Sequence, residues 1–367
     1  MLSSREREAF IRHARHFKTV LQKANELYEQ GNDSVQQGLE MFDAARNNIQ
    51  AAQKWAQTHT LEDEEAAALC CTYPQAGTYL LDLRQSPSER IQWSEAALIA
   101  AQLLSNRQLE GAYLSNLGTA YARLGNLPRA MQYYERHLAI AREIGDRRAE
   151  ATTLSNLSIV YKNLVEIQTA IQYAEQSLAI LREVVDRRVE SNTLSNLGLM
   201  YARLGALERA IECYVQALEI IREVGNRIAE GNILGNLALA LYHKGEFNRA
   251  IEFQEQQLFI TREIGDLQGE GNALGILGII CLKTGAMQRA VELFEQAIVV
   301  ARKTENRRGE GHSYWNLSQV IYEIGQRTQA INYAETALSL LQPIEDHYIS
   351  EIQEKLGQWQ SHEECVQ

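Results

Sequence analysis

The apolar positions of this chain recur with helical spacing. One stripe follows the i, i+3, i+4, i+7 pattern of a helix face, at Leu114, Leu117, Gly118 and Tyr121. Gly125 interrupts the pattern, and a second stripe follows at Ala130, Tyr134 and Leu138. The pattern therefore predicts two amphipathic helices joined by a tight turn.

The same pattern returns every 40 residues without a gap. The phrases LSNLGTAYARLG, LSNLSIVYKNLV, LSNLGLMYARLG and LGNLALALYHKG follow one another at this spacing. Glutamate recurs at Glu110, Glu150, Glu190, Glu230, Glu270 and Glu310, and alanine at Ala130, Ala170, Ala210, Ala250, Ala290 and Ala330. Such regularity indicates a solenoid, in which each unit buries its apolar face against its neighbours. We therefore predict an all-α solenoid of antiparallel helix pairs.

The turns repeat as well. A glycine follows the first helix of five units, at Gly125, Gly205, Gly245, Gly285 and Gly325. Glycine readily adopts the left-handed backbone conformation that commonly ends a helix. Val165 replaces it in the second unit and predicts a different turn there. Asp or Asn at positions 106, 146, 186, 226, 266 and 306 is placed to cap the next first helix.

The ends of the chain depart from this period, which divides the sequence into four segments. We predict an N-terminal helical segment at 1–60, a degenerate helix pair at 61–105, six units at 106–345, and a capping helix with a tail at 346–367. Ser3 with Glu6 predicts a capping box, Pro74 a kink, and Pro343 the end of the last unit. The capping helix is expected over 346–361, with a mobile tail from Ser361.

The composition narrows the class of protein. The chain has 367 residues and a formal net charge of −11, and an acidic surface disfavours nucleic-acid binding. Five cysteines without a C-x-x-C pair predict neither a disulfide framework nor a structural zinc site. The charged N-terminus lacks a signal-peptide core, and no apolar stretch approaches about 18 residues. These features predict a cytoplasmic protein with no membrane partner.

No motif of an enzyme or cofactor site is present. The P-loop, G-x-S-x-G, H-E-x-x-H and EF-hand patterns are absent. Eight histidines form no metal-spaced set. His13 and His16 lie one helical turn apart, where a solvated or partly packed face is the better interpretation. We therefore predict that the chain is not an enzyme and binds neither a metal nor a cofactor.

The units resemble the tetratricopeptide repeat. Its signature, W-x2-L-G-x2-Y and then A-x3-F, appears as Leu114, Leu117, Gly118, Tyr121, Ala130 and Tyr134. Leucine replaces the first aromatic residue, and the terminal proline is missing. The 40-residue period and the REIGD phrases are similar to those of LGN/Pins adaptors, kinesin light chains and the sensor regions of bacterial STAND-type NTPases. The resemblance covers about 106–345 and implies a right-handed superhelix with a concave groove for a peptide or protein.

A ladder of asparagines is the main candidate site within that groove. They precede the core leucine of the first helices, at Asn116, Asn156, Asn196, Asn236 and Asn316, with Ile276 at the gap. An amide can donate to and accept from an extended peptide backbone. Further candidate groove residues are Arg123, Lys162, Leu199, Arg203, Leu239, Tyr242, His243, Lys283 and Trp315. The basic members favour acidic side chains or a carboxylate.

Each ladder also has a structural interpretation. An asparagine repeated in every unit can hold the stacking of neighbouring helices instead of a ligand, and we favour ligand contact. For the glutamate ladder we favour the structural interpretation. Its members can form ion pairs with arginines at 142, 182, 222, 262 and 302, or interact favourably with the dipole at the helix start. Tyr242, Trp315 and Tyr322 predict the tightest ligand contacts over repeats four to six.

Two functional classes follow from the sequence. In the first, the chain is a protein-interaction scaffold whose groove takes an extended, acidic partner segment. In the second, it is a ligand-sensing module related to STAND-type NTPases, acting without its own ATPase domain. The phrase FDAARNNIQAAQKWA favours a common origin with STAND-type NTPases, because it is similar to the helical segment before the repeats in such proteins. The sequence determines neither the partner nor the oligomeric state.

Overall fold

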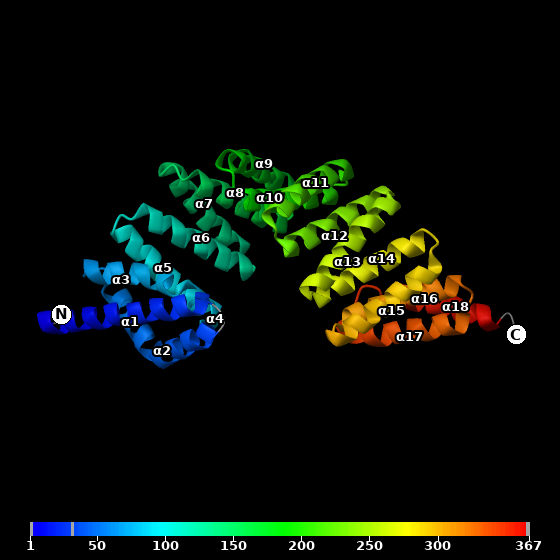
Figure 1. Cartoon of the computed structure of the whole chain (residues 1–367), viewed down its shortest axis with the longest axis horizontal. Helices are drawn as coiled ribbons and strands as arrows, with labels where there is room; N and C mark the ends of the chain where they lie inside the picture. The colour runs from blue at the N-terminus through cyan, green and yellow to red at the C-terminus, as the bar shows by residue number, and fades with distance from the viewer. Residues whose placement is uncertain (1–2, 31–32, 365–367) are drawn as a thin grey trace. The chain divides into compact units, whose positions relative to one another are not determined.

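The computed structural model describes residues 3–30 and 33–364. Every regular element in these ranges is a helix, and consecutive helices pack as antiparallel pairs (Figure 1). The predicted all-α solenoid of helix pairs is therefore confirmed. The chain divides into two compact units, residues 1–184 and 185–367, and each is described by itself.

The first unit contains the irregular N-terminal segment and two repeats. Its helices are α1 (Ser4–Gln30), α2 (Asp33–His59), α3 (Glu64–Ala76), α4 (Thr78–Arg84), α5 (Pro87–Leu103), α6 (Arg107–Arg123), α7 (Leu127–Glu143), α8 (Arg147–Asn163) and α9 (Ile167–Val184). Helices α1 and α2 pack against each other, and α3 packs against both of them and against α5. The pairs α6–α7 and α8–α9 then continue the stack.

The predicted capping box at the start of the chain is confirmed, and the helix that contains Pro74 ends before Gly77. Ser3 and Glu6 form a capping box, and the sequence Ser86–Glu89 forms a second one at α5. Helix α3 continues through Pro74, and the break lies at Gly77. A Cβ atom at Gly77 would lie 2.4 Å from the Leu21 side chain of α1, so close packing requires glycine here. The sequence Gly31–Asn32 also predicts a break after the first helix, and these two residues lie outside the described part of the chain.

The second unit contains four repeats and the C-terminal helix. Its helices are α10 (Arg187–Arg203), α11 (Leu207–Val224), α12 (Arg227–Lys244), α13 (Phe247–Ile264), α14 (Leu267–Lys283), α15 (Met287–Lys303), α16 (Arg307–Glu323), α17 (Arg327–Leu341), the short 3-10 helix η1 (Gln342–Ile344) and α18 (Ile349–Glu364). Ile352, Leu356 and Trp359 of α18 join the core of the last repeat, as a cap must. The helix extends beyond Ser361 to Glu364, so the predicted tail begins too early; residues 365–367 lie outside the described part.

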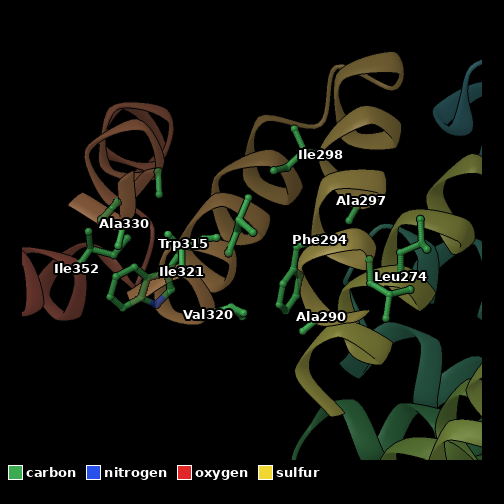
Figure 2. Packing of buried hydrophobic residues seen from close by; sticks show 14 of the residues in the cluster. Leu274, Ala290, Phe294, Ala297, Ile298, Trp315, Val320, Ile321, Ala330 and Ile352 are labelled. Carbon is green, nitrogen blue, oxygen red and sulfur yellow. The ribbon is translucent and has the colours of Figure 1, made fainter. Parts of the chain in front are cut away.

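A small residue opposite a large one sets the distance between the two helices of a pair. Gly198 of α10 faces the ring of Tyr214 in α11, and a Cβ atom there would lie 2.7 Å from that ring. Gly278 faces Phe294 in the same way, at 2.5 Å. Figure 2 shows Phe294 within this packed layer, between Ala290 and Ala297. The glycines therefore serve helix contact and not flexibility.

The capping and exit positions behave as the sequence predicts, with one exception. All six predicted caps accept a hydrogen bond from the backbone N–H three residues later, at Asn106, Asp146, Asp186, Asn226, Asp266 and Asn306. The five glycine exits are left-handed, with φ from +74° to +92°. Val165 adopts the same conformation, with φ of +67°, and its N–H donates to the Lys162 carbonyl as in the glycine turns. The prediction of a different turn at Val165 is therefore wrong.

Replacing Val165 by glycine is expected to raise the free energy of unfolding by about 0.5–1 kcal/mol. A β-branched residue is strained in the left-handed region, and the exposed Val165 side chain (77%) loses little packing when removed. Urea denaturation measures the change, and Gly205→Val should shift stability the other way. If Val165→Gly destabilises the protein, the turn carries no strain.

Candidate functional site: the amide face of the first helices

The asparagine ladder lies at the edge of the core on five of the six first helices of the repeats, and Ile276 takes its place in α14. We call these six positions, with the residues three and seven positions after them, the amide face. Asn116 is exposed, whereas Asn156, Asn196, Asn236 and Asn316 are half-buried. The leucine that follows each of them is buried, at Leu117, Leu157, Leu197, Leu237 and Leu317. The amides are therefore held by a rigid helix and still reach solvent.

The structural interpretation of the ladder predicts hydrogen bonds from these amides to neighbouring helices. The side chains of Asn116, Asn156, Asn236 and Asn316 make no hydrogen bond within the described residues. Each of these amides retains two donors and an acceptor for a further partner. This pattern supports ligand contact at those four positions.

The charge of the amide face differs from that of the whole chain. Arg123, Arg203, His243 and Lys283 lie in the last turn of their first helices and are exposed. Across the described part of each unit, Arg123, Arg203 and Lys283 take part in no ion pair. An acidic chain thus carries uncompensated cations on this face, which favours an anionic ligand.

The apolar and aromatic candidate residues differ in their exposure to solvent. Leu239 is 40% exposed, Leu199 and Tyr242 are half-buried, and Lys162 is half-buried as well. Trp315 is 1% exposed and lies in the core near Ile321 and Ile352 (Figure 2).

The prediction of Trp315 as a groove aromatic is therefore wrong. Its ring stacks on that of Trp359 with centroids 6.0 Å apart, and Tyr322 stacks on the same ring at 4.3 Å. Both aromatics thus hold the C-terminal helix α18 against the last repeat. The sequence did not show this because the partner ring lies beyond the repeat pattern.

The glutamate ladder forms the predicted ion pairs. Glu150 is buried in α8, and its carboxylate accepts from Arg142 Nε at 2.8 Å and from Arg147 Nη1 at 2.7 Å. Burial raises the pKa of Glu150, but the hydrogen bonds from the two arginines outweigh it and hold the pKa below its usual value. Equivalent pairs join Arg222 and Arg227 to Glu230, Arg262 to Glu270, and Arg302 to Glu310. The side chains of these arginines are therefore occupied by ion pairs that join neighbouring helices of the repeats.

Sequence spacing missed one cluster of polar side chains. His312 of α16 and His347 lie 35 residues apart in sequence, yet both approach the buried carboxylate of Asp346. Their ligand-type atoms lie within 4.8 Å of one another. The expectation that the histidines bring no metal-type group together is wrong for this trio. The available signal was that both histidines depart from the 40-residue pattern.

Comparison with known proteins supports the repeat assignment. The family model of the tetratricopeptide repeat matches residues 91–183, 189–263 and 269–361. No curated protein matches the chain. In the described part of the chain, the helices are too short or too polar to cross a membrane.

Solved structures share the fold at low sequence identity. A STAND ATPase with a tetratricopeptide repeat sensor from Pyrococcus horikoshii is 18% identical, with a TM-score of 0.68, and the match covers 97% of this chain and 55% of that protein. The apo form of RapI is 17% identical, with a TM-score of 0.54 and coverage of 72% and 95%. BtubC from P. vanneervenii is 19% identical, with a TM-score of 0.53 and coverage of 60% and 93%. At these identities the likeness extends to the fold alone.

Proposed function

Because this chain belongs to the tetratricopeptide repeat family, we propose that it is a non-enzymatic scaffold that binds an extended partner segment on its amide face. The observation that carries the proposal is that each compact unit presents solvent-reaching amides without hydrogen-bond partners among the described residues, at Asn116 and Asn156 in the first unit and at Asn236 and Asn316 in the second. A peptide backbone offers a donor and an acceptor at every residue, so it matches a row of equal amides. Cytoplasmic location stays a prediction of the sequence.

The partner segment is acidic in this proposal. Arg123, Arg203 and Lys283 each lie seven residues after the ladder position of their own first helix, and they have no carboxylate partner among the described residues. Exposed cations of this kind attract a carboxylate and orient it, and their effect weakens with salt. Leu239 and Tyr242 add apolar surface for one anchor side chain in the fourth repeat.

Peptide display tests this function without knowledge of the natural partner. Selection against the wild-type chain should enrich acidic peptides. Replacing two amides, Asn236→Ala with Asn316→Ala, should weaken the binding of an enriched peptide about 30- to 150-fold in fluorescence polarisation, because two amide pairs are lost at about 1–1.5 kcal/mol each.

The matched control removes two amides from second helices. Gln216 of α11 and Asn332 of α17 are exposed, and their alanine variants should bind the peptide as the wild type does. Circular dichroism should show the same helicity in all three proteins. If the amide-face variant and the control bind the peptide with equal affinity, the amide face is not the binding surface.

A second candidate function is a ligand-sensing module without its own ATPase domain. The observation that favours it is the STAND neighbour, whose match extends over 97% of this chain and so includes the N-terminal helices. A sensor should change its radius of gyration when the selected peptide binds, because ligand alters the stacking of repeats. Small-angle scattering with and without peptide distinguishes the two functions, since a passive scaffold keeps its radius.

A further inference from the structure

A cluster of two imidazoles and a carboxylate lies where the last repeat meets the C-terminal helix. His312 Nε2 and His347 Nδ1 each lie 3.1 Å from Asp346 Oδ1. Asp346 is buried, His312 is half-buried and His347 is exposed, so the cluster opens to solvent on one side. The three side chains come from α16 and from the turn between η1 and α18.

The contacts in this cluster are not explained by hydrogen bonds alone. His312 Nε2 is buried and has no partner of acceptable hydrogen-bond geometry, although it lies near Asp346. Arg308 Nε lies 3.0 Å from the other carboxylate oxygen, Asp346 Oδ2, and the Tyr348 N–H donates to Oδ1 at 3.1 Å. A buried ring nitrogen without a hydrogen bond normally calls for another partner.

The repeat register shows that both histidines are departures from the common pattern. The position of His312 is asparagine in three other units, at Asn192, Asn232 and Asn272. The position of His347 is arginine in five, at Arg107, Arg147, Arg187, Arg227 and Arg307. Asp346 keeps the register of the capping Asp and Asn residues. The two departures are the same residue type and converge on one carboxylate.

Two of the three distances between the ligand atoms suit a small tetrahedral cation, and the two imidazole nitrogens lie within 4.8 Å of each other. Zinc bonds of about 2.0–2.1 Å to imidazole nitrogen and carboxylate oxygen place neighbouring ligand atoms about 3.3 Å apart. The two 3.1 Å distances from Asp346 Oδ1 are close to that value. Two imidazoles with one carboxylate favour zinc over calcium or magnesium, which prefer oxygen ligands. Solvent at the exposed side of His347 can supply the fourth ligand.

We propose that His312, Asp346 and His347 form a zinc site that fixes the start of α18 to α16. Arg308 positions the carboxylate by its ion pair with Oδ2. Oδ1 accepts the Tyr348 N–H with one lone pair and has a second lone pair for the metal. The metal joins two segments that are separate in sequence, so binding stabilises the docking of the terminal helix. The site is independent of the amide face, and its test does not depend on the proposed peptide function.

Zinc titration of the chelator-treated full chain tests the proposal. Isothermal titration calorimetry should show one zinc ion per chain, and differential scanning calorimetry should show a higher Tm with zinc. The variant His312→Asn with His347→Arg carries the residues that other units have in register, so it should fold with unchanged helicity. It should bind zinc at least about 100-fold more weakly, and its Tm should not respond to zinc.

The control variant removes the other close pair of histidines, His13→Ala with His16→Ala, in α1. It should bind zinc and respond in Tm as the wild type does. The proposal is overturned if the wild type binds less than one zinc ion per chain, if the register variant keeps wild-type affinity, or if the control variant loses the binding instead.

Discussion

Gly198→Ala should lower the free energy of unfolding by about 2 kcal/mol. The new Cβ atom would lie 2.7 Å from the Tyr214 ring, and that ring is 1% exposed and cannot move away without disturbing the core. Overpacking of this kind costs about 1–3 kcal/mol and exceeds the gain of up to about 1 kcal/mol from replacing glycine in a helix. Urea denaturation followed by circular dichroism measures the loss.

Gly275→Ala provides the matched control because it makes the same chemical change in a first helix of the same unit. Nothing lies within 4 Å of a Cβ atom at Gly275, so this variant should gain about 0.5–1 kcal/mol. In a Tyr214→Ala background the penalty of Gly198→Ala should disappear, because the space that the ring occupied is free. A penalty that persists without the ring would show that crowding is not its cause.

Removing both arginines from Glu150, as Arg142→Ala with Arg147→Ala, should lower the free energy of unfolding by about 2 kcal/mol at pH 7. The carboxylate stays buried without a counter-charge, and such a loss costs about 3–5 kcal/mol in a fully buried pair. The cost is smaller here because both arginine side chains are about half exposed and solvent screens them. Urea denaturation at several pH values measures the effect.

The pH dependence identifies Glu150 as the cause. In the wild type its pKa is below the usual value, so its stabilisation is present above the unfolded-state pKa of about 4.3 and is lost as pH falls through the folded-state pKa. Without the arginines burial raises the pKa, and the variant should gain stability as pH falls. The difference between the two proteins should therefore shrink from pH 7 to pH 4.

The control for this experiment is Arg123→Ala with Arg136→Ala. It removes the same charge from two exposed arginines that have no carboxylate partner within the described part of the first unit. Its free energy of unfolding should stay within about 0.5 kcal/mol of the wild type at every pH. A pH-independent gap in the Glu150 experiment would contradict the assigned role of the carboxylate.

The repeating part of the chain was predictable because its evidence is local. Each capping Asn or Asp bonds the backbone three residues away, and each glycine exit needs only its own left-handed conformation. The Glu150 pair with Arg142 spans eight residues, and repetition of both ladders at one spacing made it visible. Val165 shows the limit of this reasoning, since the turn is imposed by the helices on both sides and not by the residue in it.

The sequence by itself determined the helix-pair solenoid, its register and the row of amides, because these depend on periodicity and on short-range hydrogen bonds. Only the tertiary structure decided which side chains of the irregular ends meet. In the structure Trp315 packs in the core against Trp359, α3 ends before Gly77, which packs against Leu21, and His312 and His347 lie beside Asp346. Contacts between segments outside the repeat carry no period, so their partners are set by packing in space.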